Sequence, residues 1–126
     1  MRRDRIRIER ANTILYTDAW AETVAFYRDM LGFEVSFEND WFVEFSIGPS
    51  SHLSVADADR SSIVAGDGTG LTISLEVGDV GEVRSTLIEA GVDVGEIGLR
   101  FGSPVFDVFD PSGNRIEFWS TAKPPT

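Results

Sequence analysis

The sequence contains no cysteine and a single histidine, His52, among its 126 residues. Without cysteine the chain has no disulfides, no thiolate nucleophile and no cysteine-ligated metal. A single histidine also argues against a Ser-His-Asp triad and against a histidine-rich metal centre. Any chemistry must therefore use carboxylates, hydroxyls and amides.

Basic side chains are also scarce: 11 Lys and Arg stand against 21 Asp and Glu, for a net charge of −10. Nucleic acids are bound mainly through Lys and Arg contacts to phosphates, so we expect no nucleic-acid partner. No apolar run approaches the ~20 residues of a membrane span, and no leader pattern opens the chain. We expect a cytoplasmic protein without membrane contact, whose acidity favours a cationic small ligand.

The length fits one domain, and a hydrophobic content of 42% is enough for a packed core. Residues 1–10 form a basic N-terminal arm with five arginines, residues 11–120 the domain, and residues 121–126 a tail. The arm is either a solvated terminus or a segment that touches nucleic acid or a neighbouring acidic subunit.

The domain reads as two similar halves, at about residues 11–60 and 70–120. In the first, a strand pattern leads into a helix with apolar residues Trp20, Val24, Tyr27 and Leu31, capped by Asp18 and ended by Gly32. In the second, an alternating strand precedes a helix that begins with the capping pair Asp79 and Glu82 and ends at Gly91. Each helix is followed by three short strands, predicted at 33–38, 41–47 and 52–56, and at 92–97, 104–109 and 115–119.

This pattern predicts an α+β fold of two βαβββ modules, with outer helices and curved sheets that enclose a trough. Residues 61–70 link the modules, and their glycine-rich part lacks the lysine and the helix of a phosphate-binding loop. Alternation places Ile116 and Phe118 on the helix side of the last strand and Glu117 on the trough side. By the same rule the trough-facing residues are Asn12, Ile14, Tyr16, His52, Ser54, Ala56, Thr72, Ser74, Glu76, Arg115 and Trp119.

Two segments carry a family resemblance. Residues 26–33, FYRDMLGF, and residues 107–118, DVFDPSGNRIEF, resemble the first helix and the closing strand-turn-strand of the vicinal oxygen chelate superfamily. This superfamily includes glyoxalase I, extradiol dioxygenases and bleomycin-resistance proteins. The resemblance covers residues 11–120 and implies a homodimer with its cleft at or near the subunit interface.

The resemblance also implies where a divalent metal would be held: at Asn12, Ser54, Thr72 and Glu117. Only Glu117 is a usual ligand, and one carboxylate with an amide and two hydroxyls holds a transition metal poorly. We therefore assign no metal ligands and expect no cofactor. The alternative is a divalent metal on Glu117 and His52, because His52 lies two positions from Ser54 and shares its face.

Glu117 itself has two interpretations. It is either functional, as a general base or as the anchor for a ligand cation, or a scaffold residue paired with Arg115 or Arg100. The aromatic residues Tyr16, Trp41, Phe101 and Trp119 are expected to wall the trough, because flat walls suit a planar ligand.

The sequence thus predicts a metal-independent small-molecule binding protein that resembles bleomycin-resistance proteins and sequesters a flat ligand, with a positive charge on that ligand as one option. Its ligand-binding residues are expected to be Asn12, Tyr16, Trp41, Ser54, Thr72, Phe101, Glu117 and Trp119. The alternative is a glyoxalase-like lyase or dioxygenase-type enzyme that uses Glu117, with His52 as a second catalytic candidate. A third possibility is an interaction module that keeps only the scaffold.

Overall fold

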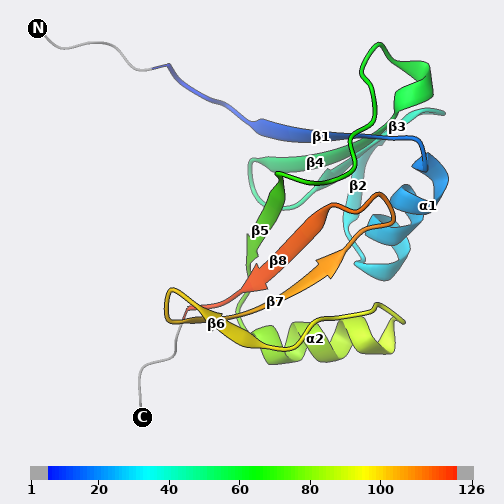
Figure 1. The fold of residues 1–126 in the computed structure, drawn as a ribbon. Coiled ribbons are helices and arrows are strands. Elements are labelled where there is room, and N and C mark those ends of the chain that lie inside the picture. Colours follow the sequence, from blue (N-terminus) through cyan, green and yellow to red (C-terminus); the bar gives the residue numbers. More distant parts are fainter. Residues whose placement is uncertain (1–5, 122–126) are drawn as a thin grey trace, which may run out of the picture.

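A computed structural model describes residues 6–121 and shows two four-stranded sheets, each with its own helix (Figure 1). The first sheet has the strand order β1-β4-β3-β2, with β1 and β4 parallel. Its elements are β1 (Ala11–Thr17), α1 (Trp20–Ala25), the π-helical turn η1 (Phe26–Met30), β2 (Glu34–Glu38), β3 (Phe42–Ser46), β4 (Ser51–Asp57) and the short 3₁₀ turn η2 (Ala58–Arg60).

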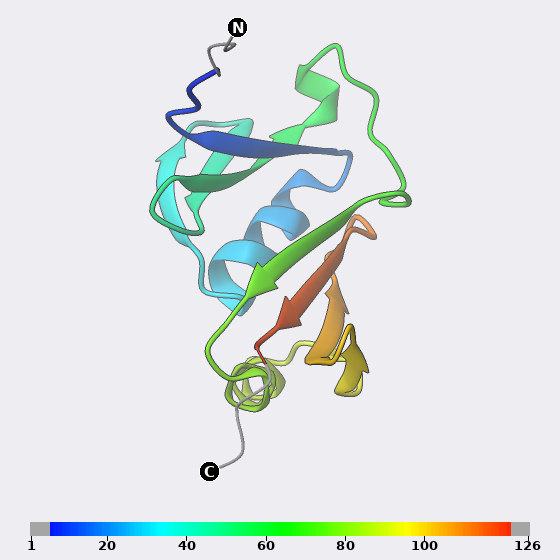
Figure 2. The same ribbon diagram turned by 90° about the vertical axis from the view of Figure 1, so that its left-hand side faces the viewer.

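The second sheet repeats this topology in the order β5-β8-β7-β6, with β5 and β8 parallel. The α+β class and the duplicated βαβββ order are therefore confirmed. The elements are β5 (Thr72–Glu76), α2 (Val80–Glu89), β6 (Gly98–Arg100), β7 (Ser103–Phe109) and β8 (Arg115–Trp119). The two sheets do not close on each other, and each keeps one face away from the helices (Figure 2).

One face of each sheet packs against the helices, as the alternation of apolar residues predicts. Leu53 and Val55 of β4 are fully buried, and Ile116 and Phe118 of β8 are buried in the same way. These residues belong to one continuous core cluster that includes residues of both modules. Burial of these alternating side chains supplies the main driving force for both sheets.

A polar contact joins the modules. The turn after β7 is held by Asp110, whose carboxylate accepts hydrogen bonds from the backbone N–H groups of Ser112 and Asn114 at 2.9 Å each. The same buried carboxylate accepts a 2.6 Å hydrogen bond from the hydroxyl of Tyr27 in η1. The Ser112 hydroxyl also lies 3.0 Å from that of Thr23 in α1. The closing turn of the second module is therefore docked on the helix of the first.

The glycine-rich end of the linker lies against this same turn. A Cβ at Gly68, whose φ is +84°, would lie 2.4 Å from the backbone carbon of Gly113. A Cβ at Gly113, whose φ is +89°, would in turn lie 2.8 Å from the carbonyl oxygen of Asp67, so both segments need glycine here. The structure thus shows a packing role for this part of the linker.

Two local predictions are wrong. Asp18 does not cap the first helix, because its N-cap residue is Ala19, whose backbone N–H donates to the hydroxyl of Thr17 at 2.9 Å. Residues 92–97 form no strand, and β6 covers only Gly98–Arg100. The apolar pattern at 92–97 reflects packing instead, because Val92 is buried and Val94 lies against the core.

Residues 1–5 of the expected arm and residues 122–126 of the expected tail lie outside the described residues. The remainder of the arm, residues 6–10, is exposed and precedes β1. Over residues 6–121, no helix has the length and apolar character that crossing a bilayer requires.

Candidate functional site

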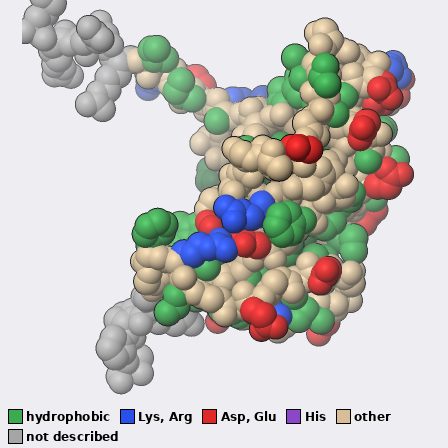
Figure 3. Space-filling model, in the orientation of Figure 1, with side chains coloured by type: hydrophobic (Ala, Val, Ile, Leu, Met, Phe, Trp, Pro, Cys, Tyr) green, Lys and Arg blue, Asp and Glu red, His purple; other side chains and the backbone are tan. Residues whose placement is uncertain are grey.

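Each sheet has one face that points away from its helix, and we call these the first and second open faces. The first open face carries Asn12, Ile14, Tyr16, Phe42, Glu44, His52 and Ser54. The second carries Thr72, Ser74, Val105, Asp107, Phe109, Arg115, Glu117 and Trp119. Figure 3 shows basic and acidic side chains interleaved on the lower module, with hydrophobic side chains on either side.

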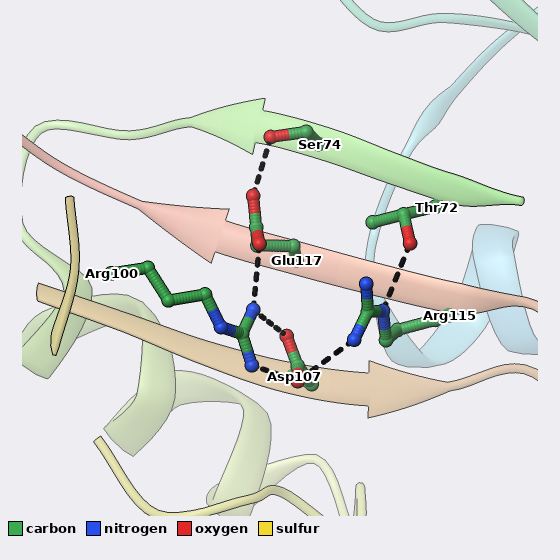
Figure 4. A network of polar contacts seen from close by, with 6 residues as sticks. All are labelled: Thr72, Ser74, Arg100, Asp107, Arg115 and Glu117. Atoms are coloured by element: carbon green, nitrogen blue, oxygen red, sulfur yellow. Dashed lines mark hydrogen bonds and ion pairs between the residues drawn. The ribbon is translucent and has the colours of Figure 1, made fainter. Parts of the chain in front are cut away.

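Glu117 lies at the centre of the second open face, between Ser74 of β5 and Asp107 of β7. Its Oε1 accepts a 2.7 Å hydrogen bond from the Ser74 hydroxyl, and its Oε2 accepts a 2.6 Å hydrogen bond from Nη1 of Arg100 (Figure 4). Arg100 is one of the two arginines expected as partners of Glu117, and the structure shows this ion pair. Glu117 is therefore a paired carboxylate.

Asp107 completes the ion-pair network. Its two carboxylate oxygens accept hydrogen bonds from Nη1 and Nη2 of Arg100, at 2.9 Å and 2.6 Å. This bidentate contact holds the pKa of Asp107 below its usual range and raises that of Arg100. On the other side, Arg115 lies 4.0 Å from Asp107 and donates from Nε to the Thr72 hydroxyl at 2.9 Å (Figure 4). Two carboxylates and two guanidinium groups thus balance in charge.

A cavity of about 300 Å³ opens beside this network. Its apolar wall comes from Phe101, Val105 and Trp119, and its polar wall includes Arg100 and Glu117. Phe101 is fully exposed at the β6–β7 hairpin and adopts a left-handed backbone with φ of +50°. The structure therefore brings three predicted residues, Phe101, Glu117 and Trp119, to one cavity, together with Ser74 and Ser103.

The first open face carries a smaller network. Asn12 Oδ1 accepts a 2.8 Å hydrogen bond from the Ser54 hydroxyl, so two predicted residues contact each other. Glu44 accepts hydrogen bonds from Arg10 at 2.7 Å and from the Ser36 hydroxyl at 2.8 Å. The Arg10 hydrogen bond is the main cause of a lowered Glu44 pKa.

The two networks occupy matching places in the repeat. Glu44 lies directly opposite Ser54 on the neighbouring strand, just as Asp107 lies opposite Glu117. Each of these central acidic residues is paired with an arginine from outside the two strands, Arg10 in the first module and Arg100 in the second. Both open faces therefore have a carboxylate–guanidinium pair at their centre.

The other predicted residues lie apart from the Glu117 cavity. Tyr16 faces the end of β4 opposite Ala56, and Trp41 precedes β3 with its ring 5.5 Å from that of Phe42. His52 lines a groove of about 650 Å³ between the modules, which Thr72 and Ser74 also line. His52 Nδ1 is buried, with no hydrogen-bond partner among residues 6–121.

The side chains at the four positions implied for a metal all have hydrogen-bond partners in the structure. Asn12 and Ser54 bind each other, Thr72 binds Arg115, and Glu117 binds Arg100 and Ser74. Hydroxyl and amide groups are weak ligands for transition metals, and a guanidinium group already occupies the one carboxylate. Within the described part of the chain, no group of three His, Cys, Asp or Glu residues is placed to hold a metal ion.

Sequence reasoning missed Asp107 and Glu44 and named Arg100 only as one alternative partner of Glu117. Alternation along 104–109 could have found Asp107, because Phe106 and Val108 are apolar neighbours on the opposite face. Arg100 had no such signal, because β6 is three residues long.

Comparison with known proteins agrees with this architecture. A sequence model of the Glyoxalase/Bleomycin resistance protein/Dioxygenase superfamily matches residues 7–118. The comparison with curated proteins found no matching sequence.

Several solved structures share the fold. A lactoylglutathione lyase from Agrobacterium tumefaciens is 24% identical, with 86% of this chain and 90% of that chain covered and a TM-score of 0.70. A glyoxalase/bleomycin resistance protein/dioxygenase from Nocardioides is 19% identical, with 98% and 91% covered and a TM-score of 0.75. A bleomycin-binding protein in complex with bleomycin is 17% identical, with 91% and 100% covered and a TM-score of 0.69. At these identities the likeness concerns the fold.

Proposed function

Because the chain belongs to the Glyoxalase/Bleomycin resistance protein/Dioxygenase superfamily, we propose that it is a metal-independent protein that binds and sequesters a flat small molecule. The observation that carries this proposal is the cavity of about 300 Å³ on the second open face. Aromatic and aliphatic walls beside a few convergent polar groups are typical of small-molecule sites.

The polar groups of this cavity suit binding better than acid–base chemistry. Both oxygens of Glu117 accept hydrogen bonds from neighbouring side chains, so the carboxylate is already satisfied in the free protein. A general base needs an oxygen lone pair that can reach the substrate proton. Trp119 and Phe101 supply flat surface on which a planar ligand can stack. A relative with this fold was solved with bleomycin bound, which supports ligand sequestration as a use of the fold.

We further propose that the binding unit is a homodimer. The cavity beside Glu117 is lined by residues of the second module, and both open faces leave large apolar side chains exposed. Ile14 is 38% exposed on the first open face, and Phe109 is 60% exposed on the second. The first open face of one copy placed over the second open face of another would cover these side chains and make a two-walled trough.

Tryptophan fluorescence tests the binding proposal. Titration of the full chain with flat compounds, in cationic and neutral sets of matched shape, is expected to give saturable quenching. That quenching should be lost in Trp119→Phe and kept in Trp20→Phe, because Trp20 lies away from the cavity and donates to the Val55 carbonyl. No saturable response across both sets would contradict the proposal and favour a domain that keeps only the scaffold.

Calorimetric metal titration separates binding from the enzyme alternative. A glyoxalase-like lyase or dioxygenase-type enzyme would hold its metal through Glu117, with His52 as the second candidate. We expect nickel, zinc, manganese and iron(II) to show no stoichiometric tight binding to the wild-type chain. Sub-micromolar uptake that disappears in Glu117→Ala would overturn metal independence.

A further inference from the structure

We propose that Arg100 is a built-in substitute for a cationic group of the ligand, and that a flat ligand with an amidinium or guanidinium group binds by displacing it. In the free protein the Arg100 guanidinium occupies the place between Asp107 and Glu117 where such a group would bind. This inference rests on the proposed binding function of the second open face and names the chemical class of its ligand.

The two carboxylates are held firmly and point toward one place. Asp107 and Glu117 lie directly opposite each other on β7 and β8, two paired strands of the sheet, and their side chains are each only 19% exposed. Arg100 Nη1 donates to both, at 2.9 Å and 2.6 Å, so a single planar cation bridges them (Figure 4). Planar groups with parallel N–H donors match carboxylates in this way.

The backbone segment that carries Arg100 is exposed and has few partners. Arg100 ends β6, an edge strand of three exposed residues, and its side chain is 40% exposed. The next residue, Phe101, has a left-handed backbone and an exposed ring, and Leu99 on the other side is 76% exposed. Apart from its ion pairs, Arg100 is paired across the sheet with Ser103, and β6 as a whole is joined to β7 through three residue pairs. Exposed edges with few buried contacts open most easily.

The site that remains without Arg100 has an excess negative charge beside an aromatic wall. Ser74 still donates to Glu117, and Arg115 at 4.0 Å from Asp107 is the cation left in the network. Two carboxylates then face one guanidinium group, and Trp119 lines the same cavity as Glu117. A planar aromatic cation satisfies both features, because its charge pairs with the carboxylates and its ring packs on Trp119.

This arrangement predicts how affinity depends on ligand charge. If Arg100 occupies the carboxylates in about nine molecules of ten, its removal strengthens binding of a competing cation about tenfold. If Arg100 instead recognised an anionic ligand directly, its removal would weaken anion binding and leave cation binding unchanged.

The experiment compares wild-type protein with Arg100→Met, which keeps the aliphatic stem and removes the charge. Benzamidine and benzoate serve as probes, because they share a flat shape and differ in charge. Trp119 fluorescence and calorimetry measure their dissociation constants. We expect Arg100→Met to bind benzamidine at least about tenfold more tightly than the wild type, with no gain for benzoate.

Two further variants sharpen the test. Arg115→Met removes the same charge from a neighbouring position without freeing both carboxylates, so its gain for benzamidine should be smaller. Arg100→Met combined with Glu117→Gln should lose the gain. Three results would overturn the inference. The first is an equal gain in benzamidine affinity in Arg100→Met and Arg115→Met, and the second is a loss or no change of that affinity in folded Arg100→Met. The third is weaker benzoate binding in Arg100→Met than in the wild type. Circular dichroism establishes that each variant is folded.

Failure of this inference can be distinguished from failure of the proposed function. A wild-type chain that responds to no flat compound, with an Arg100→Met variant that gains benzamidine, would refute sequestration and support the displaceable arginine. A wild-type chain that binds library compounds, with no gain in the variant, would do the reverse.

Discussion

The hydroxyl of Tyr27 donates a 2.6 Å hydrogen bond to the carboxylate of Asp110, and both side chains are buried. Tyr27 belongs to the helical segment of the first module and Asp110 to the closing turn of the second. The contact therefore ties the two halves of the repeat together. Asn114 also donates to the same carboxylate oxygen at 2.9 Å, so the bond is part of a network.

Removal of the Tyr27 hydroxyl should destabilise the whole domain. Tyr27→Phe leaves the buried Asp110 carboxylate short of one donor, which costs about 1–3 kcal/mol of unfolding free energy. Urea unfolding followed by circular dichroism measures the loss. Tyr16→Phe is the matched control, because in the described part of the chain the Tyr16 hydroxyl has no hydrogen-bond partner, and its effect should stay within about 0.5 kcal/mol. Equal losses in the two variants would contradict the role of this contact.

The contact between linker and turn gives a second stability prediction. Gly68→Ala would place a Cβ 2.4 Å from the Gly113 backbone at a φ of +84°, so the two segments must separate. We expect a loss of about 2 kcal/mol or more in unfolding free energy.

Gly70→Ala is the control for that experiment. Gly70 has a similar φ of +80°, but a Cβ there meets no atom within 4 Å. Its loss should be limited to the backbone strain of about 1 kcal/mol. If the two substitutions cost the same in thermal or urea unfolding, the close approach of Gly68 to Gly113 does not contribute.

The order of elements could be predicted from the sequence because burial imposes a clear period. Ile116 and Phe118 alternate with polar neighbours, and this alternation assigned the two faces of β8 correctly. Residues 92–97 were predicted wrongly, because Val92 and Val94 pack on the core from an irregular segment. Periodicity reports burial, and it cannot separate a strand from a loop that buries the same side chains.

The site was less predictable than the fold. Glu117 was identified through a resemblance, but its bond to Arg100 depends on a hairpin that brings residues 17 positions apart into contact. Likewise, Asn12 and Ser54 meet because β1 and β4 pair in parallel, 42 positions apart in sequence. Such pairings follow from register and side-chain direction, which no local pattern determines.

The ion pair of Asp107 gives a pH dependence with a definite sign. Its pKa in the folded protein is lowered, mainly by the Arg100 hydrogen bond, so the folded state binds fewer protons than the unfolded state. This contribution to stability is present above the unfolded pKa of about 3.9. It is lost as the pH falls through the lower folded value.

We therefore expect the unfolding free energy of the wild type to fall below about pH 4, and to fall less steeply in Arg100→Met. Titration of the Asp107 carboxyl carbon by NMR should show its pKa moving up toward the usual range in that variant. Arg10→Met is the control, because Arg10 pairs with Glu44 on the other sheet. An unchanged Asp107 titration in Arg100→Met would show that the ion pair is absent in solution.

The proposed dimer can be tested on the second open face without altering the charged network. Phe109 is 60% exposed at the end of β7, and in the proposed dimer the other copy covers it. Phe109→Asp places a charge in that interface, and burial of an unpaired charge is costly. Analytical ultracentrifugation should show a dimer for the wild type and a monomer for Phe109→Asp. Ile88→Asp, at a 50% exposed position on α2, should leave the dimer intact. A monomeric wild type would refute the dimer. A dimer lost only in Ile88→Asp would place the interface on another surface.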